Sequence, residues 1–191
     1  KAAFIKKDLM AREAKIISKI KKLTGLEVEI HAARSIAKAF DKLKLPYDRT
    51  AKSNEPSFTK NFLQNHPHEL ATCIADAREI NKAHTTFIDS ITKHAHKGRI
   101  HADINQIRSD QGGTVTGRFS MSNPNLQQIP ARHPEIGPMI RSIFIPEEKH
   151  KWGCFDYSQQ EPRILVHYAK LQNLEGVDEI VDAYNAGDAD F

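Results

Sequence analysis

The stretch Phe155-Asp-Tyr-Ser-Gln-Gln-Glu-Pro-Arg163 is the most informative part of this 191-residue sequence. Apolar residues before it predict a strand that ends at Asp156, and a helix should follow with Pro162 in its first turn, where the missing N–H costs nothing. A carboxylate at that place can reach a ligand, and the backbone carbonyl of Tyr157 can act as a second hard oxygen ligand for Mg²⁺. The alternative is that Asp156 only caps the helix or ends the strand.

A second stretch upstream is dense in amides, hydroxyls and arginine. It reads Thr116-Gly-Arg-Phe-Ser-Met-Ser-Asn-Pro-Asn-Leu-Gln-Gln-Ile-Pro-Ala-Arg132. Such donors suit phosphate oxygens and the acceptors of the DNA minor groove. The alternative is a polar loop whose side chains satisfy its own backbone.

Helical periodicity dominates the first half of the sequence. One amphipathic helix should end at Gly25, a second before Pro46, and a long third helix should run from near Pro67 through Ile91. The polar residues 47–57 between them predict a loop.

After Lys97 the apolar residues alternate as in a strand. We expect further strands and then two helices, at residues 142–146, 152–155, 161–171 and 175–185. The sequence therefore predicts an α+β fold with a helical region, residues 1–97, and a mixed region with antiparallel strands and flanking helices, residues 98–191.

The net charge of +4 hides a gradient along the chain. Residues 1–24 carry eight basic and two acidic side chains, whereas residues 142–191 carry four basic and ten acidic ones. This pattern suits a protein that holds a polyanion and places carboxylates beyond it, but a solvated basic helix face would give the same charges. The mean hydropathy of −0.55 and the lack of a long apolar run argue against a membrane span.

The cysteines and histidines give no metal-site signal. Cys73 and Cys154 both lie in apolar patterns and are expected to be buried free thiols, as in a reducing compartment. Ten histidines are present, but none has the spacing with cysteine that zinc sites use.

The two stretches together resemble the family A DNA polymerases, the bacterial DNA polymerase I type with phage and organellar relatives. Within this family the sequence looks like a phage member. Residues 156–163 look like the family's motif A, and Asn123-Pro-Asn-Leu-Gln-Gln-Ile-Pro130 looks like its preceding palm segment. Residues 79–89 resemble the helix that leads from thumb to palm. On this resemblance residues 1–97 would be a thumb-like region and residues 98–191 the first part of the palm.

The resemblance implies roles for the residues around Asp156. Asp156 would be the catalytic carboxylate that binds Mg²⁺, and Tyr157 would add its carbonyl in a two-metal site. Ser158 and Gln159 would lie at the incoming deoxynucleoside triphosphate. Glu161 would close against the sugar 2′ position and exclude ribonucleotides.

The resemblance also implies contacts to primer–template DNA. Arg118 would reach the minor groove at the primer terminus, and Asn125, Gln128 and Arg132 would hold the duplex. Lys82 would grip the backbone together with the basic first helix. The cytoplasm of a bacterium or of a phage-infected host would be the location.

The sequence departs from the family pattern at Gln160 and Pro162, and it has extra residues around 108–113. The family's motifs B and C, which include a second metal-binding carboxylate, are expected downstream of residue 191. We therefore expect the chain to be inactive alone and to be one part of a template-directed DNA polymerase, truncated or split. The alternative from another class is a non-catalytic module that binds primer–template DNA; an RNA polymerase is disfavoured by Glu161.

Overall fold

The computed structural model of the protein describes residues 1–110, 112–131 and 133–187. The chain divides into two compact units, Lys1–Ile145 and Pro146–Phe191. Helices and short antiparallel strand pairs make an α+β fold, as the sequence predicted. The boundary expected near residue 97 falls inside the first unit.

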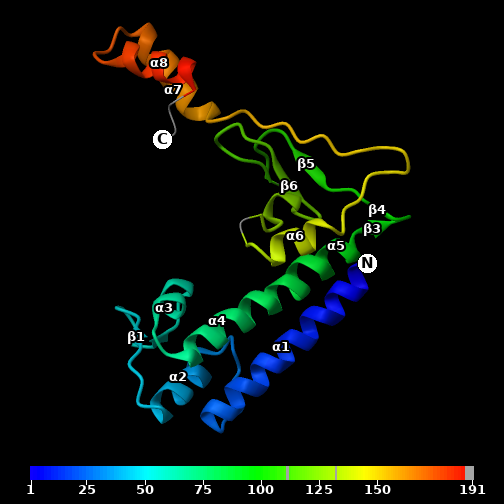
Figure 1. The fold of residues 1–191 in the computed structure, drawn as a ribbon, viewed down its shortest axis with the longest axis vertical. Helices are drawn as coiled ribbons and strands as arrows, with labels where there is room; N and C mark the ends of the chain where they lie inside the picture. The colour runs from blue at the N-terminus through cyan, green and yellow to red at the C-terminus, as the bar shows by residue number, and fades with distance from the viewer. Residues whose placement is uncertain (111, 132, 188–191) are drawn as a thin grey trace. The chain divides into compact units, whose positions relative to one another are not determined.

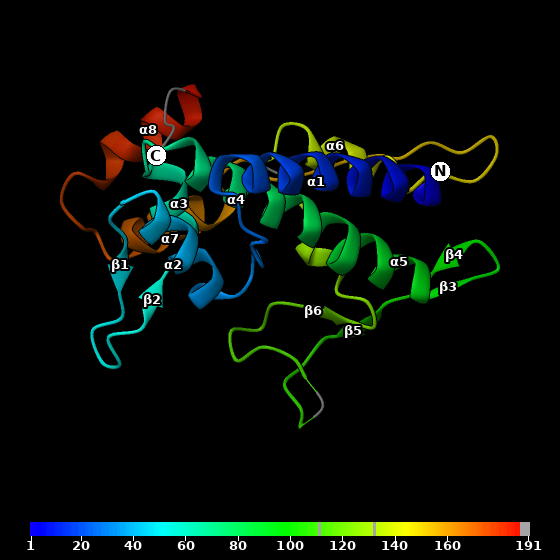
Figure 2. The same cartoon turned by 90° about the horizontal axis from the view of Figure 1, so that it is seen from below.

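Two long helices form the frame of the first unit (Figures 1 and 2). Helix α1 (Ala2–Thr24) lies along α4 (Glu69–Lys82), and α4 runs on through the π-helical segment η1 (Ala83–Ile88) into α5 (Asp89–Lys93). Gly25 ends α1 in the left-handed conformation, with φ 66°, which glycine adopts without steric cost. The first helix and the long third helix of the sequence prediction are confirmed.

One core of the first unit is built around Phe40 of α2 (Ala33–Lys42), whose side chain is fully buried. The Phe58 ring lies 4.9 Å from it between centroids, and Leu63 of α3 (Lys60–Asn65) joins the same cluster. Further members come from α1, α2 and α4: Ile20, Ile36, Leu70 and Ile74. Four helices, α1 to α4, thus share one apolar centre.

A second core lies toward the N-terminal end of α1, where Leu9 packs with Ile88 of η1. Helix α6 (Ile136–Arg141) adds Ile136 and Ile140, one turn apart on its buried face. The sequence prediction did not include α6. The same helix pair therefore carries both cores.

The strands of the first unit are short and pair only in twos. The pairs are β1 (Asp48–Arg49) with β2 (Pro56–Ser57), β3 (Ala95–His96) with β4 (Arg99–Ile100), and β5 (Asp103–Asn105) with β6 (Ser120–Ser122). The expected loop at residues 47–57 therefore contains a small hairpin. In the third pair Ile104 lies opposite Met121, so the sequence between residues 105 and 120 connects these two strands.

The strands predicted at residues 142–146 and 152–155 are wrong for the described chain. Residues 142–146 follow the end of α6, and Ile143 and Phe144 pack against the second core instead of alternating between two faces. Residues 151–157 are extended without a hydrogen-bonded neighbouring strand, and Phe155 is 96% exposed. A strand forms only by pairing, so apolar alternation alone was not sufficient.

The second unit consists of this extended run and two helices that pack on each other, α7 (Gln160–Leu171) and α8 (Val177–Ala186). Both helices were predicted within two residues. Cys154 in the extended run is exposed, which corrects the expected burial, whereas Cys73 in α4 is buried as expected and burial raises its pKa. Among the described helices, none combines the length and the apolar character that a membrane crossing requires.

Replacing Phe40 by alanine should lower the free energy of unfolding by about 3–5 kcal/mol, because a large cavity would open where four helices meet. Phe4 of α1 is 78% exposed, so Phe4→Ala is the matched control and should change stability by less than about 0.5 kcal/mol. Urea titration followed by circular dichroism measures both. Equal losses for the two variants would contradict the proposed core.

Candidate functional site

The residues expected to carry chemistry around Asp156 lie together in one turn of the second unit. Asp156, Tyr157 and Ser158 are exposed, and Tyr157 is 80% accessible. Gln159 precedes α7 in the left-handed conformation with φ 52°, which costs a non-glycine residue about 1 kcal/mol or more. Glu161 follows in the first turn of the helix.

Asp156 could either bind a ligand or cap helix α7, and the geometry of the turn excludes the capping role. The residue at the N-cap of α7 is Gln159, and no side-chain hydrogen bond caps the helix there. Asp156 lies three residues earlier in the extended run, so the carboxylate is not used as a helix cap.

Two side chains of the helices hold the turn in place. The Tyr184 hydroxyl of α8 donates to Oε1 of Gln159 at 3.0 Å, and the Arg163 side chain donates from Nε to the carbonyl oxygen of Ser158, also at 3.0 Å. The Arg163 guanidinium also lies 4.6 Å from the centroid of the Tyr184 ring. Tyr184 could not be predicted from the sequence, because nothing local to it indicates a contact 25 residues back along the chain.

The donor set of this turn suits a hard divalent cation only in part. The Asp156 carboxylate and the Tyr157 carbonyl are adjacent oxygen donors in an exposed segment, and Mg²⁺ is bound through one or two carboxylates together with substrate oxygens and water. Within the residues that the structure describes, no three His, Cys, Asp or Glu side chains converge as a metal cluster. Asp156 and Tyr157 could therefore supply part of a ligand set.

The polar stretch 116–132 lies in the first unit, around β6 and the turn after it. Arg118 is exposed just before β6, and Gln128 is exposed in the 3₁₀ turn η2 (Leu126–Gln128). Asn125 accepts a hydrogen bond from the backbone N–H of Gln127 at 3.1 Å, so this amide does satisfy its own loop. Arg132 lies outside the described residues.

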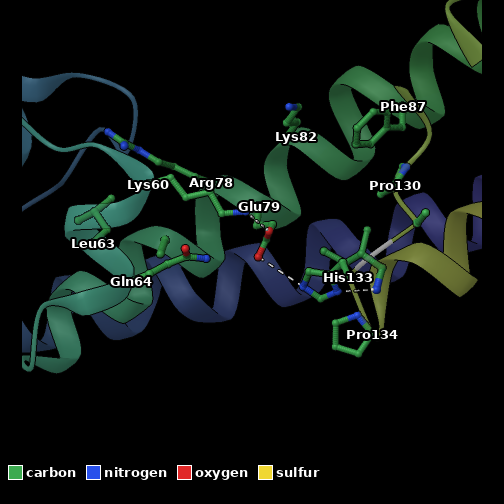
Figure 3. Close-up of a pocket in the computed structure, with 13 residues that line it drawn as sticks. Lys60, Leu63, Gln64, Arg78, Glu79, Lys82, Phe87, Pro130, His133 and Pro134 are labelled. Atoms are coloured by element: carbon green, nitrogen blue, oxygen red, sulfur yellow. Dashed lines mark hydrogen bonds and ion pairs between the residues drawn. The ribbon is translucent and has the colours of Figure 1, made fainter. Parts of the chain in front are cut away.

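A groove in the first unit brings together cations from separate segments (Figure 3). It has a volume of about 820 Å³ and lies between α3, α4 and η1 on one side and residues 130–131 and 133–136 on the other. Lys82, the predicted contact to the DNA backbone, is exposed on its wall and lies 5.7 Å from the centroid of the Phe87 ring. Residues flanking Arg132 also line the groove: Ala131 and His133.

Other charged residues of the groove were not predicted from the sequence. Lys60 and His133 both pair with Glu79, at 3.1 Å and 3.3 Å. Arg78 donates to the carbonyl oxygens of Ile30 and Phe58, and its burial lowers its pKa below the ordinary value. Arg78 thus ties loops to α4, and Lys82 remains the groove cation with the greatest freedom to meet a polyanion.

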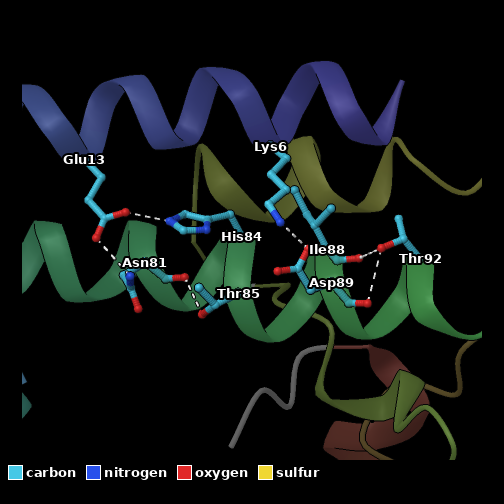
Figure 4. A network of polar contacts seen from close by, with 8 residues as sticks. All are labelled: Lys6, Glu13, Asn81, His84, Thr85, Ile88, Asp89 and Thr92. Carbon is cyan, nitrogen blue, oxygen red and sulfur yellow. Dashed lines mark hydrogen bonds and ion pairs between the residues drawn. The ribbon is translucent and has the colours of Figure 1, made fainter.

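Polar contacts fix the helix that carries Lys82 (Figure 4). Glu13 of α1 accepts from the Asn81 side chain at 2.9 Å and pairs with Nε2 of the buried His84 at 2.6 Å. One and a half turns further on, Lys6 pairs with Asp89 at 2.5 Å. These contacts set the rotation of the α4–η1 helix against α1, and therefore which of its side chains face the groove.

Comparisons with known proteins show the family to which the chain is similar. The model of DNA polymerase family A matches residues 2–188. A DNA-directed DNA polymerase of Pseudomonas phage M6 is 34% identical over 190 residues, covering 94% of this chain and 28% of the relative. A thermostable DNA polymerase I of Thermus filiformis is 38% identical over 143 residues, covering 72% of this chain and 16% of the relative. The chain therefore belongs to DNA polymerase family A.

A solved structure supports the fold. The POL domain of Pol1 from M. smegmatis, in a complex with DNA primer-template and dNTP, matches with a TM-score of 0.75 at 24% identity. The match covers 97% of this chain and 32% of that one. The chain thus spans less than a third of the length of the phage relative and of this structure.

Proposed function

We propose that this chain is the thumb-like and first palm part of a template-directed DNA polymerase, which adds deoxynucleotides to a primer 3′ end by phosphoryl transfer. The observation that carries the proposal is the turn that presents Asp156, Tyr157 and Glu161 together at the start of α7. Family membership supports the same reaction. In this assignment residues 1–97 are the thumb-like region and residues 98–191 the first part of the palm.

Asp156 and the carbonyl of Tyr157 would hold Mg²⁺, which would neutralise charge on the phosphoryl group and its leaving oxygen. The exposure of both residues leaves them accessible to a triphosphate. One carboxylate cannot complete a two-metal site, so the chain by itself should not extend a primer. The second carboxylate would come from the polymerase segments that this chain does not contain.

Ser158 and Gln159 would contact the incoming nucleotide, and Glu161 would exclude ribonucleotides. Deoxy- and ribonucleotides differ by one hydroxyl, which attractive contacts distinguish poorly, so exclusion needs a group placed where the 2′-OH would lie. Glu161 stands five residues after Asp156, on the far side of the turn and in the helix. Asp156 could therefore face the phosphates of the nucleotide while Glu161 faces its sugar.

Primer–template DNA would bind the first unit through phosphate contacts. The cationic groove with Lys82 offers a path for a strand, and Arg118, Asn125 and Gln128 form an exposed polar strip around β6. Arg132 would belong with this strip. The same features would also serve the alternative function, a non-catalytic primer–template binding module, because none of them depends on Asp156.

A polypeptide with the remaining polymerase motifs would be the protein partner, as a continuation of the chain or a separate chain. Helix α7 leaves large apolar side chains exposed at positions that share one stripe: Ile164, Leu165, Tyr168 and Leu171. Exposed apolar stripes of this kind mark surfaces that another protein element covers. The phage relative is more than three times as long as the part that this chain matches, so a longer polymerase of this family has room for such an element.

DNA binding by the chain should be sensitive to salt and should depend on Lys82. Raising salt from roughly 50 to 200 mM should weaken binding of a primer–template duplex by about tenfold or more if several phosphates are contacted, and Lys82→Ala should lower the slope of log affinity against log salt by about 1. Fluorescence anisotropy with a labelled duplex measures both quantities.

Lys170→Ala is the matched control, since it removes the same charge from a lysine of α7 that pairs with Asp178 at 3.2 Å. Its salt slope should equal that of the unchanged chain. Affinity that is flat with salt, or equal slopes for all three proteins, would show that the groove does not hold DNA.

Glu161→Ala should raise ribonucleotide incorporation relative to deoxyribonucleotide incorporation by on the order of tenfold to a hundredfold, because the space for a 2′-OH would open. Single-nucleotide extension kinetics with both nucleotide types measure the ratio, in a polymerase assembled from this chain and the remaining family segments. Glu179→Ala removes a comparable first-turn carboxylate from α8 and serves as control. An unchanged ratio in Glu161→Ala would mean that Glu161 only stabilises the helix terminus.

A further inference from the structure

We propose that Tyr184 is a positioning residue for the nucleotide site and acts through Gln159. The inference rests on the proposed function, which places Gln159 at the incoming nucleotide. Tyr184 lies on α8, outside the motif around Asp156, and its side chain is buried with 6% exposure. Its hydroxyl therefore acts inside the unit, on Gln159 of the turn before α7.

The turn needs stabilising contacts from outside it, because the backbone conformation of Gln159 is unfavourable. Gln159 adopts the left-handed conformation, with φ 52°, directly before the first helical residue. Side chains with a Cβ rarely occupy this conformation unless surrounding contacts require it. Here the hydrogen bond from the Tyr184 hydroxyl to Oε1 of Gln159, at 3.0 Å, joins the strained residue to a buried side chain.

The same ring supports the neighbouring residue of the turn. The Arg163 guanidinium lies over the Tyr184 ring at 4.6 Å from the centroid, while Nε of Arg163 donates to the carbonyl oxygen of Ser158 at 3.0 Å. Tyr184 thus fixes Ser158 through Arg163 and Gln159 through its hydroxyl. Ser158 and Gln159, the two residues that we assign to the nucleotide, are therefore both positioned by the buried Tyr184 side chain.

The hydroxyl has a role that the ring alone cannot fill. The terminal torsion of a glutamine has a broad, twofold preference, so packing alone does not decide which way the amide faces. A donor that binds Oε1 selects one orientation and fixes where the NH₂ group lies. Loss of the hydroxyl should leave the helices packed but remove the hydrogen bond that orients the Gln159 amide.

Tyr184→Phe tests this directly, because the ring and its contact with Arg163 are kept. In the ¹⁵N-labelled chain, the side-chain amide resonances of Gln159 and the backbone amides of Ser158 and Gln159 should shift and broaden in this variant. Tyr47→Phe is the matched control, since it removes a hydroxyl that accepts from Arg49 at 3.3 Å in the other unit. Unchanged Gln159 resonances in Tyr184→Phe would overturn the proposal.

Kinetics separate positioning from stability. In the assembled polymerase Tyr184→Phe should raise the KM for the deoxynucleotide about three- to tenfold, the size of one net hydrogen bond, with a smaller change in kcat. In a Gln159→Ala background the same substitution should have no further effect on KM, because the residue through which it acts is gone.

An equal effect of Tyr184→Phe in both backgrounds would show a general structural role and overturn the inference. If the unchanged assembly does not extend a primer at all, the proposed function fails and the catalytic part of the inference falls with it. The resonance comparison then still decides whether Tyr184 orders Gln159.

Discussion

Along the line where α1 lies against α4 and η1, buried apolar side chains are interrupted by a small set of paired polar ones. Apolar contacts at the two ends of this helix pair form the two cores of the first unit. Between them, Glu13 binds both Asn81 and the buried His84. Apolar packing tolerates small rotations, whereas a buried carboxylate that must keep both partners does not. The polar contacts of Glu13 therefore fix the rotation and register of the α4–η1 helix against α1, and the apolar contacts hold the two helices together.

The position of the groove follows from that register. Lys82 and Glu79 project from the same helix that carries Asn81 and His84. A change in the rotation of this helix would move the groove wall as a whole. The pairing of Glu79 with Lys60 and His133 then ties α3 and the segment after β6 to the same wall. The groove that we propose as a DNA-binding surface is made from three distant segments and thus depends on one helix–helix contact.

Helix periodicity and capping made much of the fold predictable from the sequence. The end of α1 at Gly25 and the start of α7 around Pro162 follow from local chemistry that needs no tertiary partner. The strands predicted at residues 142–146 and 152–155 failed because strand formation depends on a neighbour that local alternation cannot reveal. Helix α6 was missed because the sequence reading assigned residues 136–141 to no element.

In the candidate site, too, the local features could be predicted from the sequence and the long-range contacts could not. The residues of the Asp156 turn are contiguous, so the sequence placed them together and the structure does the same. The groove and the Tyr184 contact join residues that are far apart in the chain, and only the fold brings them together. Lys82 was predicted as a DNA contact from the resemblance alone, and nothing in the sequence indicated that Lys60 or His133 would line the same groove.

The central claim is that the Asp156 turn is the catalytic part of a DNA polymerase, and primer extension tests it most directly. The chain would be combined with a polypeptide that supplies the remaining family segments, and extension of a primer–template measured with Mg²⁺ and deoxynucleotides. The account predicts template-directed extension that Asp156→Asn abolishes and that Asp178→Asn, at the Lys170 pair of α8, leaves intact. Undiminished extension by Asp156→Asn would contradict it.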